Sequence, residues 1–382
     1  MAAPCIGIIG TGFVADLYMR SLRTFPEFKI VAATDVNRVR LSQFCAHWKI
    51  REVPSLSEML NIGGDDSPTL ILNLTNPSSH FEVSRACLLA GKHVYSEKPL
   101  ATNMDDAHAL CAIAESKGLL LASAPCSILG EAAQTLWLAL RRNEIGKVRL
   151  VYAELDDDFV SRAPYRKWIS ESGAPWPFRD EFTVGCTLEH AGYYLTWLMA
   201  MFGTIETVIA SSANLIVDKL GNGVPTAPDF SCATLAFRSG IVARLTCSII
   251  APHNHGIRVI GDTGVLEVGE AWDNDAPVRV RRRVIVRRGL MNSPIAKRVK
   301  IKGATHPKVA RWGAAAMNFA LGPAEMLAAL NESRPSRVSA GFALHLNEVT
   351  LAIQSGNGVH EIRTTCPPME PMPWALQRIP TL

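Results

Sequence analysis

The chain has 382 residues, of which 48% are apolar and 19% are charged. The length allows two or three domains with real cores, and the composition excludes a disordered or low-complexity protein. The net charge is +4, but residues 279–302 alone contain ten basic and no acidic residues. Because the remainder then has 29 basic against 35 acidic residues, the basic character belongs to one segment.

The cysteine and hydropathy patterns bear on the compartment. The nine cysteines are odd in number and show no C-x-x-C spacing. Free buried thiols in a reducing compartment therefore fit better than disulfides or a zinc site, and no metal is expected. The chain begins without a basic, apolar leader, and no apolar run approaches the roughly 18 residues of a membrane span. We expect a cytoplasmic protein with no membrane partner.

The first 124 residues alternate between strand and helix patterns. Strands are predicted at residues 5–9, 29–34, 69–75, 93–95 and 119–123, and helices at 17–25, 39–48, 57–60, 79–90 and 104–117. This alternation is typical of right-handed βαβ units around a parallel sheet. We therefore predict an α/β fold whose N-terminal domain, residues 1–124, is a doubly wound parallel sheet of the Rossmann type.

The second part of the chain has a different pattern. Strands that often alternate polar and apolar residues are predicted at 148–155, 205–211, 231–238, 241–249, 256–260, 264–268 and 278–286. Helices are predicted at 132–142, 187–202, 314–331 and 340–354. Short turns between successive strands favour a large, mainly antiparallel open sheet with one covered face. Residues 125–382 are thus expected to form an α+β domain for substrate binding and oligomerisation.

A dinucleotide fingerprint follows the first strand. The run Gly10-Thr-Gly12-Phe13-Val14-Ala15 is a G-x-G-x-x-A motif at the start of the first helix, where free N–H groups favour a pyrophosphate. Asp35 ends the second strand, where a carboxylate accepts hydrogen bonds from ribose hydroxyls and repels a 2′-phosphate. We predict NAD as cofactor, with NADP less favoured, although Arg38 lies near enough to pair with that phosphate.

A lysine lies directly after the fourth strand, in the run Ser96-Glu97-Lys98-Pro99. Ligands of open parallel sheets bind outside the carboxyl ends of the strands, so Lys98 is expected beside a nicotinamide ring and a hydroxyl substrate. Its pKa can be lowered there, which would let it move a proton. The alternative is a surface lysine before a turn proline.

Together these segments resemble the glucose–fructose oxidoreductase / inositol dehydrogenase / rhizopine catabolism (Gfo/Idh/MocA) family. The matching runs are residues 10–15, Asp35, Asn73-Leu-Thr-Asn-Pro77 with His80, and Ala90-Gly-Lys-His-Val-Tyr-Ser-Glu-Lys-Pro99. The resemblance implies that Lys98 is catalytic. It also implies that Thr75, Asn76, Pro77, His80 and Glu97 lie at the nicotinamide end of the cofactor, and a role for His80 in holding backbone groups remains an alternative.

The same family has an Asp and a His four residues apart on a helix, in a D-x-G-x-H pattern. Aligning that pattern on Gly192 puts His190 at the Asp position and Tyr194 at the His position. Residues i and i+4 share a helix face, so His190, Tyr194 and Lys98 are expected to converge on a substrate hydroxyl. Glu189 could instead supply the carboxylate, although it points about 100° away from His190. Aromatic packing of an apolar helix is the alternative for Tyr194.

A long segment, residues 156–180, precedes this helix and carries the candidate substrate contacts. Long loops beside a site are usually functional, and aromatic, basic and acidic side chains suit sugar faces and hydroxyls. The candidates are Tyr165, Arg166, Trp168 and Arg179. A loop that is merely anchored by its own aromatic residues is the alternative.

Three functions remain open from the sequence. The first is an NAD-dependent oxidoreductase that oxidises a carbinol of a sugar, cyclitol or sugar derivative, with Lys98 and Tyr194 handling the hydroxyl proton. The second is an NAD-dependent glycosidase that works by transient oxidation, elimination, hydration and re-reduction, and the third is a non-catalytic NAD-binding regulator.

The arginine-rich segment is expected to be a solvated or subunit-facing strand rather than a nucleic-acid site, and a homo-dimer or homo-tetramer through the C-terminal sheet is expected.

Overall fold

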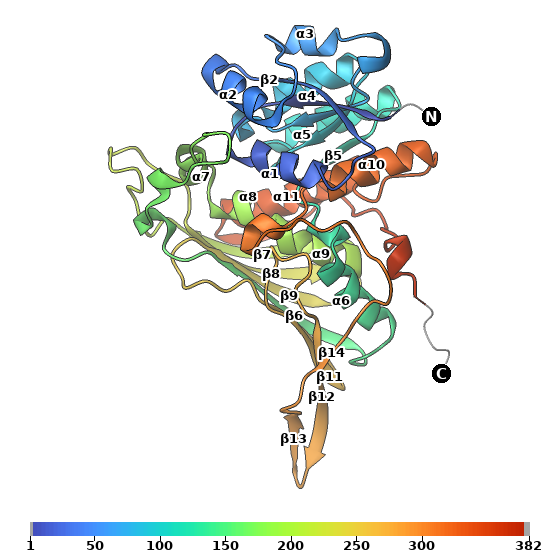
Figure 1. Cartoon of the computed structure of the whole chain (residues 1–382). Coiled ribbons are helices and arrows are strands. Elements are labelled where there is room, and N and C mark those ends of the chain that lie inside the picture. The colour runs from blue at the N-terminus through green and yellow to red at the C-terminus, as the bar shows by residue number, and fades with distance from the viewer. Residues whose placement is uncertain (1–2, 378–382) are drawn as a thin grey trace.

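A computed structural model describes residues 3–377, and its first layer is a five-stranded parallel sheet in the order β2-β1-β3-β4-β5 (Figure 1). Its strands are β1 (Cys5–Ile9), β2 (Lys29–Thr34), β3 (Leu70–Asn73), β4 (His93–Ser96) and β5 (Leu121–Ser123). The helices between them are α1 (Phe13–Leu22), α2 (Arg38–Trp48), α3 (Leu56–Leu60), α4 (His80–Leu89) and α5 (Met104–Ser116). Most residues of these strands are buried, including polar ones at their carboxyl ends, as a sheet covered on both faces requires.

The second layer is a ten-stranded sheet in the order β13-β12-β11-β10-β6-β9-β8-β7-β15, with β14 paired to β12. The strands are β6 (Val148–Asp156), β7 (Ile205–Ala213), β8 (Phe230–Phe237), β9 (Val242–Ser248), β10 (Ile257–Gly261), β11 (Gly264–Val268), β12 (Arg279–Val286), β13 (Gly289–Asn292), β14 (Lys297–Arg298) and β15 (Gly358–Glu361). Only the central β6–β9 pair among them is parallel. The two sheets confirm the predicted fold class.

Helices fill the space between the two sheets (Figure 1). They are α6 (Glu131–Arg141), α7 (Phe178–Val184), α8 (Cys186–His190), α9 (Gly192–Phe202), α10 (Leu321–Asn331) and α11 (Ala340–Ser355). The last two come from the C-terminal part of the chain but pack against the parallel sheet. A Cβ atom at Gly322 of α10 would lie 2.4 Å from the Tyr95 ring, and Ala343 of α11 belongs to the apolar cluster on that sheet. Both sheets therefore share one interior.

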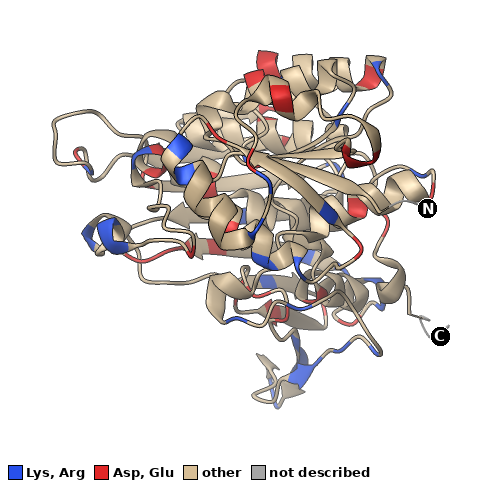
Figure 2. Cartoon of the chain, turned by 45° about the horizontal axis from the view of Figure 1, so that its top comes forward, with Lys and Arg blue, Asp and Glu red and all other residues tan. Residues whose placement is uncertain are grey.

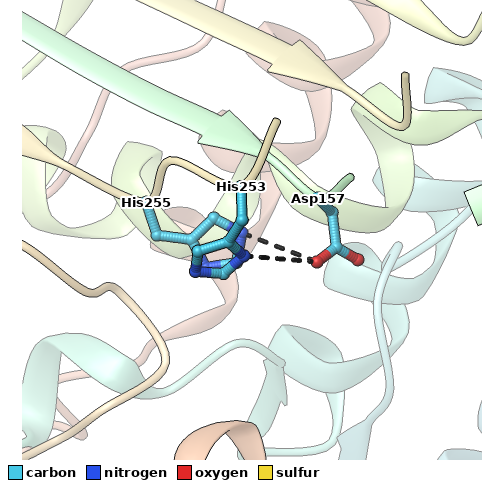
Figure 3. A group of neighbouring side chains, drawn as sticks. All are labelled: Asp157, His253 and His255. Carbon is cyan, nitrogen blue, oxygen red and sulfur yellow. Dashed lines mark ion pairs between the residues drawn. The ribbon is translucent and has the colours of Figure 1, made fainter. Parts of the chain in front are cut away.

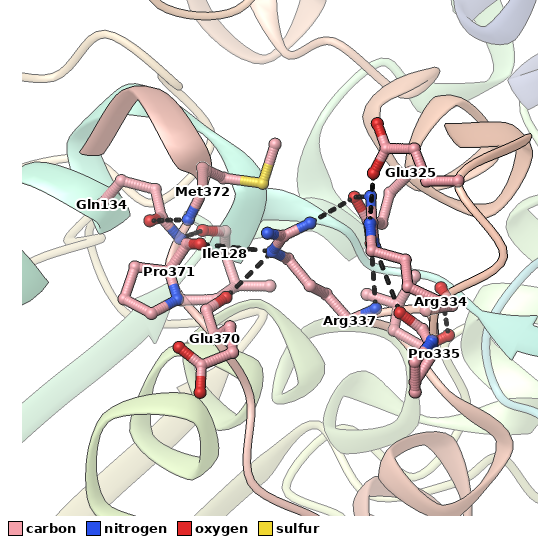
Figure 4. A network of polar contacts seen from close by, with 12 residues as sticks. Ile128, Gln134, Glu325, Arg334, Pro335, Arg337, Glu370, Pro371 and Met372 are labelled. Atoms are coloured by element: carbon pink, nitrogen blue, oxygen red, sulfur yellow. Dashed lines mark hydrogen bonds and ion pairs between the residues drawn. The ribbon is translucent and has the colours of Figure 1, made fainter. Parts of the chain in front are cut away.

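A polar network holds the C-terminal segment in place (Figure 4). Glu325 of α10 is almost fully buried and pairs with Arg334 at 2.5 Å and with Arg337 at 2.9 Å. Arg337 Nε also donates to the Glu370 carbonyl at 3.0 Å, and the Met372 N–H donates to Gln134 on α6 at 2.9 Å. Arg337, which Glu325 holds, and Gln134 thus tie the end of the described chain to the rest of the molecule.

Two predicted helices are broken in the structure. The segment predicted as 187–202 is divided at Ala191 into α8 and α9. The segment predicted as 314–331 becomes a 3₁₀ turn at Gly313–Ala316 followed by α10. In the second case Asn318 interrupts the helix because its side chain donates to Thr24 and Pro307, and its N–H donates to Asn274. Such tertiary hydrogen bonds cannot be predicted from the spacing of apolar residues.

The basic segment forms a projecting β-hairpin. Strands β12 and β13 extend beyond the rest of the sheet, and Lys and Arg residues gather on this arm (Figures 1 and 2). Apolar side chains on the same arm are exposed, among them Ile285 and Leu290. Among residues 3–377, every helix is too short or too polar to cross a membrane.

Candidate active site

The turn between β1 and α1 forms a cradle for an anion. Gly10 has a φ of +94°, and a Cβ atom there would lie 2.5 Å from the Leu74 carbonyl oxygen. Gly12 caps α1 without a side-chain hydrogen bond, and a Cβ atom there would meet nothing within 4 Å in the described chain. The space beside Gly12 at the start of α1 is therefore open in the described chain, and a helix N-terminus is where a pyrophosphate would be bound. Phe13 and Val14 form the first turn of the same helix, and Ala15 is fully buried beneath it.

Asp35 lies at the end of β2 with both carboxylate oxygens engaged. It accepts hydrogen bonds from the Thr11 N–H at 2.7 Å and the Asn37 N–H at 2.8 Å, and Arg40 pairs with both oxygens. Burial alone would raise the pKa of Asp35, but these hydrogen bonds outweigh it and hold the pKa below its ordinary value. The carboxylate is therefore charged, and its partners leave only 2% of the side chain exposed.

The arginine beside Asp35 is Arg40, not the predicted Arg38, which is exposed. Arg38 is the first residue of α2, whereas Arg40 is the third. Side chains of a helix lean toward its N-terminus, so the third position reaches back to a group that precedes the helix. The sequence signal for Arg40 was therefore its position in the first turn of α2.

The segment after β3 borders the same cleft edge and is held by buried polar contacts. Thr75 donates to Asn73 at 2.6 Å, and Asn76 and Pro77 begin a short 3₁₀ turn. His80 is fully buried, with Nδ1 2.7 Å from the Pro99 carbonyl oxygen and Nε2 2.9 Å from the Thr75 carbonyl oxygen. Because both ring nitrogens contact backbone carbonyls, His80 fits the role of fixing the two neighbouring turns.

Lys98 lies where the sequence predicted it, at the carboxyl end of β4. The preceding Glu97 is buried and accepts a hydrogen bond from the Tyr18 hydroxyl at 2.6 Å. The Nζ atom of Lys98 forms an ion pair with Glu189 Oε2 on α8. This contact joins the parallel sheet to the helical layer, and both side chains are largely shielded from solvent.

The protonation of Lys98 differs from the prediction. Burial by itself lowers the pKa of an ammonium group, but Glu189, Tyr193 and further carboxylates hold the pKa of Lys98 above its ordinary value. The sequence expectation of a lowered pKa is therefore corrected. The sequence shows that Lys98 follows a strand. It does not show which carboxylate will face the lysine, because Glu189 lies on a helix 91 residues further on.

Tyr194 does not converge with Lys98. Its side chain is fully buried, and its hydroxyl donates a hydrogen bond to the backbone carbonyl of His255. The ring packs edge-on against Trp197 with centroids 5.3 Å apart. Burial raises its pKa, and the carboxylates that add to this effect are those of Glu270 and Glu154. The hydroxyl of Tyr194 thus serves the packing of α9 against the sheet.

His190 faces Glu181 of α7, with Nε2 3.5 Å from Oε1. Burial, Lys98 and His255 together lower the pKa of His190 to about 3, and burial and Glu189 raise the pKa of Glu181. At neutral pH both groups therefore favour their neutral forms. His190 lies near the lysine but is not its ion-pair partner.

The side chain that pairs with Lys98 is instead Glu189, and Tyr193 follows it by four residues. Tyr193 is 8% exposed, and it acts on the pKa of Lys98. Aligning the family pattern on Gly192 selected His190 and Tyr194. The i, i+4 spacing could not distinguish that pair from Glu189 and Tyr193, because both pairs are four residues apart. The sequence did offer one signal for Glu189, namely its negative charge, because an ammonium group pairs with a carboxylate more favourably than with an imidazole.

The segment 156–180 is anchored partly by its own aromatic side chains. Tyr165 is buried and packs against Phe178 and Phe182 at centroid distances of 5.1 and 5.3 Å. Arg166 lies 4.8 Å above the Phe178 ring, and Arg179 lies 5.8 Å from it. Trp168 packs edge-on against Trp176 and is 36% exposed.

The tip of this segment docks on the cofactor domain. Ser172 donates its N–H and its hydroxyl to Asp16 of α1, each at 2.9 Å. Glu171 pairs with Arg20 of α1 at 3.4 Å. The segment therefore joins the C-terminal part of the chain to α1, the helix that begins at the cradle.

Fold and site together define a dinucleotide-dependent oxidoreductase, because the cradle and Lys98 open on the same edge of one parallel sheet. Residues 5–124 match the model of the oxidoreductase family with an NAD-binding Rossmann fold, and residues 133–267 match the GFO/IDH/MocA C-terminal domain. The chain therefore belongs to the Gfo/Idh/MocA family of NAD(P)-dependent oxidoreductases, as the sequence resemblance predicted.

Individual relatives are distant. The chain is 26% identical over 270 residues to trans-1,2-dihydrobenzene-1,2-diol dehydrogenase of Mus musculus, which covers 70% of this chain and 74% of that protein. A putative NADPH-dependent oxidoreductase from Desulfitobacterium hafniense matches with a TM-score of 0.74 at 16% identity, covering 95% of this chain and 99% of that one. The WlbA dehydrogenase from Bordetella pertussis, solved with NADH and UDP-GlcNAcA, matches with a TM-score of 0.67 at 18% identity, covering 92% and 95%.

Proposed function

We propose that the protein is an NAD-dependent dehydrogenase that transfers a hydride between nicotinamide and a carbinol of a sugar, cyclitol or sugar derivative. The observation that carries this proposal is the shielded Lys98–Glu189 ion pair at the carboxyl edge of the parallel sheet. A bound nicotinamide dinucleotide would accept or donate the hydride. The names of the relatives support an alcohol substrate, since one acts on a diol and another was solved with UDP-GlcNAcA.

We assign to Lys98 the uptake of the proton from the substrate hydroxyl. Oxidation of a carbinol releases that proton together with the hydride, so the reaction needs a group that takes it up. The ammonium of Lys98 donates one N–H to Glu189, and passing that proton to the carboxylate lets Nζ accept the substrate proton in its place. Glu189 positions the ammonium, and Tyr193 is assigned a hydrogen bond to the substrate oxygen.

The cofactor preference is assigned to Asp35. Its charged carboxylate suits the ribose hydroxyls of NAD and repels the 2′-phosphate of NADP. Arg40 works in the opposite direction because it neutralises part of that charge and could pair with a phosphate. We expect a higher kcat/KM for NAD than for NADP in steady-state kinetics, and the reverse order would overturn this assignment.

The function is tested with purified protein and a panel of sugars, inositols and glycosides. Formation of NADH from one or more polyols is the expected result, and Lys98→Ala should lower kcat at least 100-fold. Binding of NAD to Lys98→Ala, followed by fluorescence, should change little and also shows that the variant is folded. Unchanged kcat in Lys98→Ala would refute the assignment.

The same panel separates the alternatives. Release of a sugar from a glycoside without net NADH would establish the redox-neutral glycosidase instead. Tight NAD binding with no turnover of any compound would indicate a regulator.

A further inference from the structure

A cluster of three potential metal ligands lies on the sheet beneath the candidate active site (Figure 3). Asp157 follows the last residue of β6, and His253 and His255 lie between β9 and β10. The backbone of this region is fixed, because Asp156 and Asn254 exchange two hydrogen bonds of 3.1 and 2.9 Å. Residues 253 and 255 flank that bridge on an extended segment, so their side chains point to the same side.

One carboxylate orients both imidazole rings. Glu270 Oε1 lies 2.7 Å from His255 Nδ1, and Glu270 Oε2 lies 3.0 Å from His253 Nε2. The opposite nitrogens, His255 Nε2 and His253 Nδ1, are left facing Asp157 Oδ1 at 3.8 and 3.9 Å. A carboxylate that holds the far nitrogen of a histidine is the usual second layer of a metal site.

The inner histidine is buried with one nitrogen unsatisfied. The side chain of His255 has no exposed surface, and its Nε2 has no hydrogen-bond partner among residues 3–377. Buried polar atoms are nearly always bonded, so an orphaned nitrogen that faces a carboxylate points to a missing ligand. The three candidate ligand atoms lie within 4.8 Å of one another. A tetrahedral Zn²⁺ ion holds its ligands about 3.4 Å apart, so each separation would have to shorten by between about 0.4 and 1.4 Å to close the site.

We propose that Asp157, His253 and His255 bind one divalent transition-metal ion of the Zn²⁺ class. Two imidazoles and a carboxylate suit such ions, whereas Mg²⁺ and Ca²⁺ prefer oxygen ligands alone. Three protein ligands leave a coordination position for water or another oxygen ligand. His253 is half exposed, which gives the ion a path from solvent.

The site goes beyond the proposed function, because no step of the hydride transfer needs it and its occupancy is measured without turnover. It nevertheless adjoins the candidate active site. The Trp272 ring packs against His255 at a centroid distance of 4.3 Å and against Tyr193 at 5.6 Å. One side chain therefore separates the proposed ion from the groups around Lys98.

The test is metal binding by untagged full-length protein that has been stripped with a chelator and dialysed. Titration with ZnCl₂ should show one ion per chain, and Co²⁺ should give visible d–d absorption of a site with nitrogen and oxygen ligands. His253→Ala and Asp157→Asn should each weaken Zn²⁺ binding at least tenfold. Glu270→Gln should weaken it by roughly 10- to 100-fold, as loss of an orienting carboxylate does elsewhere.

The matched control is His47→Ala, because His47 is as exposed as His253 and also lies near a carboxylate, Glu171 at 3.9 Å. It should bind Zn²⁺ as the unmodified protein does. The nine free cysteines are competing sites that none of these variants alters. Circular dichroism identifies any variant that fails to fold. If either His253→Ala or Asp157→Asn fails to fold, the Zn²⁺ affinity of the other variant tests the proposal. The proposal would be refuted if the unmodified protein did not bind one Zn²⁺ ion per chain, or if folded His253→Ala and Asp157→Asn bound Zn²⁺ as tightly as the unmodified protein.

Discussion

At the scale of single residues, the ion pair between Lys98 and Glu189 controls the protonation of the lysine. Burial favours the neutral amine, and the adjacent carboxylate favours the ammonium more strongly. Removing one partner of such a pair leaves the other in a poorly solvated place without its counter-charge. The pH dependence of kcat/KM should therefore change when Glu189 is replaced.

Glu189→Gln is expected to shift the pH profile of kcat/KM. Since Glu189 raises the pKa of Lys98, its loss lowers that pKa, and the limb that reports Lys98 moves to lower pH. Glu181→Gln is the control, because burial already favours the neutral form of Glu181 and its smaller effect should move the limb less. A limb that stays in place in Glu189→Gln would contradict the pairing.

The two adjacent tyrosines should respond in opposite ways. Tyr193→Phe is expected to lower kcat with little change in unfolding free energy, because its hydroxyl is assigned to the substrate. Tyr194→Phe should lower the unfolding free energy by about 1–3 kcal/mol, because the buried His255 carbonyl loses its donor, and should leave kcat unchanged. Urea unfolding and steady-state kinetics measure both quantities, and the reversed pattern would restore Tyr194 to the site.

At the scale of elements, α11 joins the two sheets. Asn347 accepts a hydrogen bond from the Ala101 N–H at 3.2 Å on the side of the parallel sheet. Two residues earlier, His345 Nε2 accepts from the Ile205 N–H at 3.1 Å, at the start of β7. Because a protonated imidazole cannot accept that hydrogen bond, the contact of α11 with β7 requires a neutral ring.

Acid should therefore weaken the fold through His345. Burial lowers its pKa to about 4, so between pH 6.5 and 4 the unfolded chain binds a proton that the folded chain does not. This group makes the unfolding free energy fall with falling pH, by about 1.4 kcal/mol per pH unit at most. His345→Gln, whose amide oxygen can still accept, should show a shallower fall in urea titrations across this range. His108→Gln, on the exposed side of α5, is the control, and equal slopes in all three proteins would count against this role.

At the scale of the whole molecule, the arm of β12 and β13 projects beyond the sheet (Figure 1). It combines basic residues (Figure 2) with exposed apolar side chains. Ile285 is 78% exposed and Leu290 is 62% exposed. A strand pair that leaves the body of the sheet with such side chains outward is suited to contact a second copy of the chain. The arginines of the arm help keep it soluble when it is free.

We expect a homo-dimer or homo-tetramer by multi-angle light scattering. The double substitution Ile285→Lys and Leu290→Lys should shift the population toward the monomer, since it places charge in the proposed contact. Val217→Lys, at a comparably exposed valine away from the arm, should leave the assembly intact. A monomeric unmodified protein would refute the expectation.

Local features of the sequence predicted much of the fold and one side of the site. The glycine run at residues 10–15, the alternation of strands and helices, and the position of Lys98 depend on residues that are neighbours in the chain. Their periodicity and spacing therefore predicted the parallel sheet, the cradle and the edge at which a substrate would bind. The same local signals placed Asp35 at the cradle.

Only the tertiary structure decided which groups meet across the layers. Helix spacing accepted His190 with Tyr194 as readily as Glu189 with Tyr193, and the packing of α8 against the sheets brought Glu189 to Lys98. The cluster of Asp157, His253 and His255 joins residues about a hundred positions apart, and it exists because β10 runs antiparallel to β6 and therefore begins beside the carboxyl end of β6. Contacts of this kind follow from strand pairing and packing, which no local pattern encodes.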